Sequence, residues 1–169
     1  DESGVVLTPA DTLATQVRSL TSYLLGLRYL TEQQTTIIAE YYRNGAGFTQ
    51  VEAQQFFELA HSASADQRLR SVLAQAAARG YVGPNPMRDY FYLRVSQPEP
   101  FDILYFAPAL TVIANLDDGS ISAAPELAYT GVTNLDLRLR LFFLSAGQLT
   151  DFGEKQNDRR LELRARYYF

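Results

Sequence analysis

Arginine is the residue type in this sequence that is spaced to act as a group. Arg138 and Arg140 occupy alternate positions in one segment, and Arg164 and Arg166 do so in the last segment. Alternate residues of a β-strand share a face, so two adjacent strands would present these guanidinium groups as one cluster. Rings of basic side chains attract and select anions in pores. If the strands close into a barrel, the candidates for such a cluster in its interior, the lumen, are Arg28, Arg94, Arg138, Arg140, Arg164 and Arg166.

Carboxylates accompany these arginines and open a second interpretation. The acidic candidates on the same face are Glu40, Glu126, Asp136 and Glu162. In a narrow barrel, arginine–carboxylate pairs would fill the interior, whereas in a wide barrel the arginines would border an open channel. The sequence leaves both interpretations open for a large barrel and favours the filled interior for an eight-stranded one.

The sequence offers little for catalysis or metal binding. It contains no Cys and a single histidine, His61, whose local candidate partners are Ser62, Ser64 and Asp66. These residues do not match the spacing of a catalytic or metal-binding motif. We interpret His61 as an exposed loop residue, and we expect no catalytic residue, no metal and no cofactor.

Composition and charge exclude several classes of protein. The chain has 169 residues, of which 47% are hydrophobic, so it is not of disordered composition. The net charge of -4 argues against general nucleic-acid binding. No apolar run reaches the roughly 18 residues of a membrane-spanning helix, but a transmembrane β-strand carries a weaker, alternating pattern.

Strand-like alternation dominates the sequence. It is strictest in residues 160–169, where Leu161, Leu163 and Ala165 alternate with charged residues. Pro108 and Pro125 lie inside two such segments and predict bulges, because proline cannot donate to a ladder. The seven predicted strands are residues 23–29, 37–44, 90–96, 104–115, 121–130, 135–144 and 160–169.

One stretch and the beginning of the chain differ from this pattern. Residues 51–60 and 65–79 are rich in helix-forming residues with apolar positions at helical spacing. We therefore expect an irregular lead-in over residues 1–13 and a β-barrel segment over 14–169, with a helical loop insertion over 49–86. As alternatives, this insertion could narrow the lumen, cap the barrel or lie on a surface.

Three features indicate that the apolar face points outward to lipid. Long arginines, with very few lysines, occupy the opposite face. The short connections (30–34, 96–101 and 131–134) all fall at one end of the strands, and the long ones (44–87, 115–120 and 145–158) at the other, as in outer-membrane barrels. The aromatic residues of the apolar face near the short-turn end are Tyr29, Tyr129, Tyr167 and Phe169, which predicts an interfacial girdle.

The end of the chain carries a family resemblance. Residues 161–169, Leu-Glu-Leu-Arg-Ala-Arg-Tyr-Tyr-Phe, resemble the terminal strand of bacterial outer-membrane β-barrel proteins of the porin-like class. The resemblance implies an all-β, antiparallel transmembrane barrel in the outer membrane, in contact with its lipid. It also implies that the barrel-assembly machinery reads the terminal aromatic strand.

The number of strands bears on whether the barrel is complete. Bacterial single-chain barrels have an even number of strands, so seven predict that this chain is part of a larger barrel closed by further strands. A complete eight-stranded barrel is the alternative. We expect a channel for small solutes that favours anions; a non-conducting sleeve or anchor for a partner protein, and a soluble ligand-binding barrel, are the other hypotheses.

Overall fold

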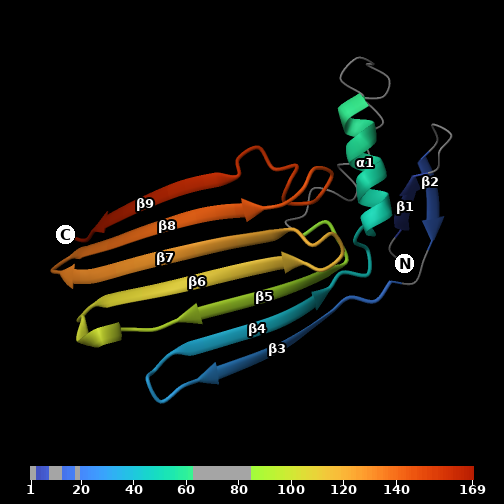
Figure 1. Cartoon of the computed structure of the whole chain (residues 1–169). Helices are drawn as coiled ribbons and strands as arrows, with labels where there is room; N and C mark the ends of the chain where they lie inside the picture. Colours follow the sequence, from blue (N-terminus) through green and yellow to red (C-terminus); the bar gives the residue numbers. More distant parts are fainter. Residues whose placement is uncertain (1–2, 8–12, 18–19, 63–84) are drawn as a thin grey trace.

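The fold is built almost entirely from antiparallel β-structure (Figure 1). The computed structural model describes residues 3–7, 13–17, 20–62 and 85–169. The elements in chain order are β1 Ser3–Leu7, β2 Leu13–Val17, β3 Tyr23–Leu30, β4 Thr36–Arg43, α1 Gln50–Ser62, β5 Asp89–Ser96, the short 3-10 helix Pro100–Asp102, β6 Phe106–Asn115, β7 Ile121–Val132, β8 Leu135–Ser145 and β9 Arg159–Tyr167.

Strands β3 to β9 form one seven-stranded sheet, in which each strand pairs with the next one along the chain. The predicted all-β class and the seven predicted strands are confirmed. The sheet is not closed into a barrel, because β3 and β9 each have one hydrogen-bonded neighbour in the described part of the chain. These two edge strands run in the same direction, so they cannot complete an antiparallel ladder with each other.

The register divides the side chains of the sheet between two faces. Leu27 lies opposite Ala39, and Leu139 opposite Leu163, on what we call the apolar face. Nothing in the described structure covers this face: Leu27 is 69% exposed and Leu163 is 74% exposed. The polar face carries the alternate residues, among them the register pair Glu126 and Arg140.

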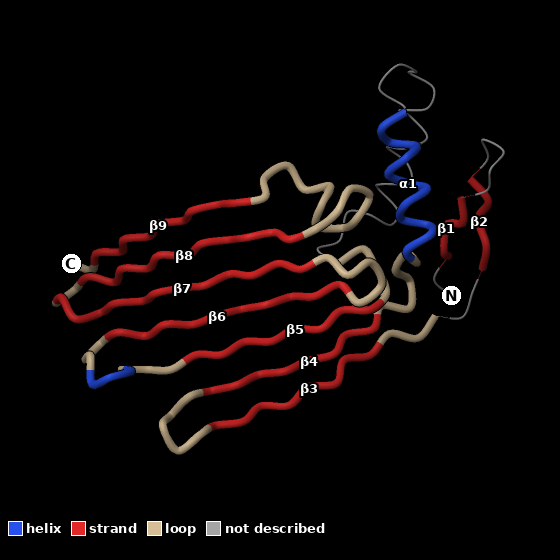
Figure 2. The backbone as a smooth tube through the Cα atoms, viewed as in Figure 1, coloured by secondary structure: helices blue, strands red, loops and turns tan. Residues whose placement is uncertain are grey.

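The connections lie at the two ends of the sheet as predicted, with one exception to their predicted lengths (Figure 2). Because β6 begins at Phe106, the β5–β6 connection has nine residues and is longer than the five-residue β6–β7 connection at the other end. Residues 31–35, 97–105 and 133–134 link strands at the short-turn end. In the last of these turns Asn134 adopts a φ of 60°, a conformation that Asn tolerates better than most residues. Residues 44–88, 116–120 and 146–158 link strands at the long-loop end.

The buried core lies at the long-loop end, where α1 and the loops pack against Tyr90 of β5. Its residues are Phe48, Ala53, Phe56, Phe57, Met87, Tyr90 and Phe152. Tyr42, Ile113 and Leu144, which point from the polar face, pack against it. Helix α1 is therefore anchored to the polar-face side of the sheet. There the apolar side chains of the helix and of the loops bury one another, and this burial stabilises the contact.

A capping box starts α1. Thr49 Oγ1 accepts the Glu52 backbone N–H at 3.3 Å, and Glu52 Oε2 accepts the Thr49 backbone N–H at 2.8 Å. This reciprocal pair satisfies two backbone donors at the start of the helix. The helix predicted over residues 51–60 is thus confirmed, whereas the one over 65–79 lies outside the described residues.

Two local predictions differ from the structure. The lead-in predicted as irregular contains β1, which pairs with β2 from Ser3↔Val17 to Leu7↔Leu13, because this hairpin satisfies the backbone of both segments. The bulges predicted at Pro108 and Pro125 are wrong, since the β6–β7 register passes through both without a shift. Pro108 is tolerated because it lies just beyond the last β5–β6 pair, Ser96↔Ala109, where its missing N–H interrupts no ladder.

No helix in the described ranges has both the length and the apolar character needed to cross a membrane.

Truncation of Phe57 tests the anchoring of α1. Phe57 is 3% exposed, so Phe57→Ala should lower the free energy of α1 opening by about 3 kcal/mol, through lost burial and a cavity. Amide hydrogen exchange of α1 measures this. Val51→Ala is the matched control, because Val51 is 62% exposed on the same helix and should change the value by less than about 0.5 kcal/mol. Equal effects of the two variants would contradict this account of the core.

Candidate functional site on the polar face

The register places all the candidate lumen arginines on one face of the sheet. Arg138 lies directly opposite Arg164, and Arg140 lies opposite Glu162. The same alternation puts Arg28 on β3 and Arg94 on β5 on this face, because Arg28 and Arg94 are both register partners of Ile38 on β4. The arginines are therefore spread over four strands of one sheet, β3, β5, β8 and β9.

Glu126 is the centre of the best-ordered polar contact on this face. Its side chain lies between Arg94 and Arg140 and is only 7% exposed. Arg140 Nε donates to Glu126 Oε2 at 2.6 Å, and Arg140 Nη2 donates to the same oxygen. Arg94 Nη2 lies 3.7 Å from Glu126 Oε1. One carboxylate thus joins guanidinium groups from β5 and β8, and the three groups together keep one positive charge.

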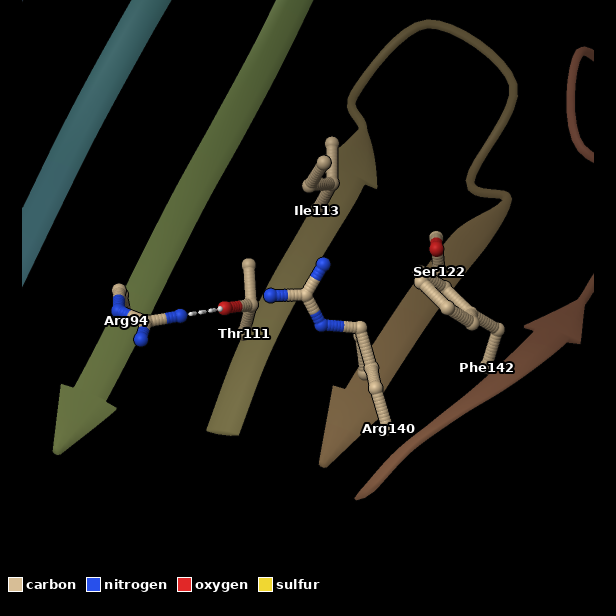
Figure 3. Close-up of a pocket in the computed structure, with 7 residues that line it drawn as sticks. Arg94, Thr111, Ile113, Ser122, Arg140 and Phe142 are labelled. Atoms are coloured by element: carbon tan, nitrogen blue, oxygen red, sulfur yellow. Dashed lines mark hydrogen bonds between the residues drawn. The ribbon is translucent and has the colours of Figure 1, made fainter. Parts of the chain in front are cut away.

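A hollow of about 260 Å³ lies beside this contact (Figure 3). Arg94 and Arg140 extend toward each other above β6, and Arg94 Nη1 donates to Thr111 Oγ1 at 2.8 Å. The hollow is lined by Arg94, Thr111, Ile113, Ser122, Ala124, Arg140 and Phe142. Two guanidinium groups and two hydroxyl-bearing residues give it the chemistry to accept an anion.

The other candidate charges are not joined in this way. Within the described ranges, Arg28, Arg138 and Arg164 have no carboxylate within 4.0 Å. Arg138 Nε and Asp136 Oδ1 are buried without a hydrogen-bond partner. The register pair Arg138 and Arg164 therefore places two like charges side by side, which is unfavourable unless something negative lies near them.

Other candidate carboxylates contribute less. Glu162 Oε2 lies 3.5 Å from Arg160 Nη2 on the surface of β9. Asp136 is the register partner of Arg166, and no ion pair between described residues includes either Asp136 or Glu40. The arginine–carboxylate packing that the sequence allows is therefore present at Glu126 and sparse elsewhere on the described face.

Sequence reasoning missed two contributors to the site. Thr111 binds Arg94, and Phe142 supports two arginines, with the Arg160 guanidinium 4.2 Å and that of Arg140 5.8 Å from its ring centroid. Such cation–π contacts orient a guanidinium group over an aromatic face. The alternation of residues in β6 and β8 could have placed Thr111 and Phe142 on this face, but their partners depend on cross-strand register.

Three of the residues predicted to form an aromatic girdle lie on the apolar face at the short-turn end. Tyr29, Tyr129 and Tyr167 are exposed there, and the Tyr167 and Phe169 rings lie 6.2 Å apart. The β5–β6 turn adds apolar residues that the sequence reasoning did not single out, led by Phe101 at 93% exposure. The short-turn end of the sheet thus presents a band of exposed aromatic rings.

A polar network joins the long loops at the other end. Tyr90 donates its hydroxyl proton to buried Asp151 Oδ2 at 2.8 Å, and the Asp151 backbone N–H donates to Asp118 Oδ2 at 2.7 Å. His61 lies at the end of α1, with Nε2 2.8 Å from Glu154 Oε2. In the part of the chain that the structure describes, no three His, Cys, Asp or Glu side chains converge to hold a metal ion. We interpret this network as structural: its hydrogen bonds hold the long loops together.

Removal of the Glu126 charge tests the three-residue contact. Glu126→Gln should lower the free energy of unfolding by about 1–3 kcal/mol, because two guanidinium groups lose their charged acceptor. Denaturant unfolding measures the change. Glu162→Gln is the control: its contact with Arg160 is exposed, so its loss should cost less than about 0.5 kcal/mol. The assignment would be wrong if both variants behaved alike.

The pH dependence of the loop network follows from Asp151. Burial raises the pKa of its carboxyl above the ordinary value of 3.8. Because the folded state then holds the proton more tightly than the unfolded chain, the loops should gain stability as the pH falls from neutral through this raised pKa toward 3.8. Hydrogen exchange of residues 146–158 in the wild-type protein and in Asp151→Asn measures this gain. The variant should lack it, and the same pH profile in both proteins would refute the assignment.

Comparison of the chain with models of known protein families, with curated proteins and with solved structures finds no match.

Proposed function

We propose that this chain forms part of a bacterial outer-membrane β-barrel that passes small solutes and favours anions. The observation that carries the proposal is the segregation of the sheet: apolar side chains are uncovered from β3 to β9, while the charged side chains gather on the opposite face. In a bilayer, the first face would meet hydrocarbon and the second would border water. A soluble barrel would need the apolar face on its inside.

The anion preference rests on the excess of arginine over carboxylate on the polar face. Glu126 compensates one charge of the pair Arg94 and Arg140, and Arg138 and Arg164 have no ion-pair partner among the described residues. A positive wall attracts anions and repels cations. Lipid would contact the apolar face and the aromatic band, and the terminal strand β9 would be read by the barrel-assembly machinery.

A second candidate function is a non-conducting sleeve or anchor for a partner protein. The contact of Glu126 with two arginines favours it, because such ion pairs fill the interior of narrow barrels. Helix α1, anchored on the polar-face side of the long-loop end, would further narrow an entrance there. A sleeve would co-purify with its partner through detergent extraction and would carry no current.

Ion selectivity in planar bilayers tests the channel. The assembly extracted from its membrane should conduct, and the double variant Arg138→Glu with Arg164→Glu should lower the anion-to-cation permeability ratio by at least about threefold, because two positive charges of the wall become negative. Arg159→Glu is the control, since Arg159 pairs with Phe143 on the apolar face and should leave the ratio unchanged. The absence of current, or an unchanged ratio in the double variant, would exclude this function.

A further inference from the structure

The two edge strands of the sheet are built to be paired. All eight residues of β3 and all nine of β9 are exposed. Soluble proteins protect long edges with charged side chains, proline or bulges. Neither strand contains proline, β3 has one charged residue, the charged residues of β9 lie on the polar face except for Arg159, and the ladders that join the two strands to β4 and β8 run without a register shift. Both edges thus keep a straight row of backbone groups free to receive another strand.

The direction of the strands limits what can fill the gap. Six successive antiparallel pairings make the first and the seventh strand point the same way, from the long-loop end to the short-turn end (Figure 1). Direct pairing of β3 with β9 would therefore be parallel. An antiparallel closure needs an odd number of additional strands between them.

Neither a second copy nor the β1–β2 hairpin meets this requirement. Copies related by rotation about the barrel axis would again place β9 parallel to β3. A two-fold axis across the strands would make antiparallel pairs, but it would put the long loops of the two copies on opposite ends, unlike the one-sided loops of outer-membrane barrels. Strands β1 and β2 have five residues each and pair with each other, whereas a membrane-spanning strand takes about 9–11 residues.

The charge on β9 indicates the chemistry of its missing neighbour. Arg164 faces Arg138 on its inner side, and no carboxylate of the described residues lies within ion-pair distance of either. The outer side of Arg164 is open. A carboxylate directly opposite Arg164 on the next strand would compensate this pair, because opposite charges on facing positions stabilise a ladder.

We propose that the sheet is closed by an odd number of antiparallel strands from outside residues 1–169, and that the strand beside β9 carries an Asp or Glu opposite Arg164. The inference rests on the proposed membrane barrel, and it names the partner as an alternating segment, apolar on the lipid face and acidic on the polar face. It also gives β9 two neighbours and so leaves no edge in the hydrocarbon, where unpaired backbone groups are strongly disfavoured.

Photo-crosslinking of the protein in its own membrane identifies the neighbour. Leu163→p-benzoylphenylalanine places the reactive group on β9, and Leu139→p-benzoylphenylalanine, one strand inward on the same face, is the matched control because both of its neighbours lie within this chain. Mass spectrometry of the Leu163 adduct should give a peptide from outside residues 1–169 with alternating apolar and polar residues, including an acidic one. The Leu139 adducts should be confined to β7 and β9.

The remaining outcomes overturn the inference. An adduct of Leu163 with β3, with residues 1–19 or 63–84, or with β9 of a second copy would show closure from within this chain or by its copies. No adduct at Leu163, when Leu139 reacts, would show an open edge.

Charge reversal tests the acidic partner separately. Arg164→Glu, combined with the reactive group at Leu163, should reduce the yield of the external adduct by at least about fivefold, because a carboxylate would then face a carboxylate. Arg164→Lys, which keeps the positive charge at the same position, should leave the yield unchanged. Equal yields in the two variants would overturn the acidic partner. The identity of the adduct does not depend on whether the assembly conducts ions. An assembly that gives the external adduct but no current would therefore refute the channel alone. An assembly that conducts but gives no external adduct would refute this inference alone.

Discussion

The alternation of side chains across a β-strand is the constraint on which this structure depends. Seven strands keep that alternation in nearly continuous register. For example, Leu27, Ala39 and Leu93 are register partners on β3, β4 and β5 and lie on the same face. A shift of one residue in any ladder would exchange the two faces of a strand and bring charged side chains among the leucines. The apolar and polar faces are therefore a property of the register as much as of the sequence.

A consequence is that the sheet itself has no core. Soluble antiparallel sheets bury their apolar face against a second layer, but here the described core gathers around α1 and the long loops, where Phe57 and Met87 are buried. The stability of the sheet in water would rest on backbone pairing and on cross-strand contacts such as Glu126 with Arg140. The apolar face needs an environment that the described chain does not supply, and a bilayer meets that need in the proposed barrel.

The charges of the polar face fall into two groups with different consequences. Arg94 and Arg140 share one carboxylate and are held in place, so they act mainly to tie β5, β7 and β8 together. Arg138 and Arg164 face each other without compensation in the described residues. Their mutual repulsion makes this part of the face the more receptive to a negative group, whether a passing anion or a carboxylate of a neighbouring strand. The proposed anion preference and the proposed acidic neighbour of β9 thus both depend on this uncompensated positive charge.

The sequence by itself determined the seven strands of the main sheet, helix α1 and the two faces of the sheet, but not the pairing of β1 with β2. Strict alternation in residues such as Leu161, Glu162 and Leu163 specifies a strand with one apolar side, because side chains repeat every two residues, and the helix-forming residues after Thr49 specify α1. Loop lengths predicted the two ends of the sheet for every connection except β5–β6, where residues 97–105 outnumber residues 116–120 at the other end. These properties are local, and a local pattern is enough to fix them.

Only the tertiary structure decided which groups meet. Alternation placed Arg94, Glu126 and Arg140 on one face, but the offset between β5, β7 and β8 selected Glu126 as the carboxylate that two arginines share. The core at the long-loop end brings Phe48, Phe57 and Phe152 together from different loops, which no periodicity encodes. The pairing of the strands also decided that the sheet stays open, because six antiparallel pairings make the two edge strands run in the same direction. Contacts between distant segments depend on register and on the path of the loops, which a local pattern does not specify.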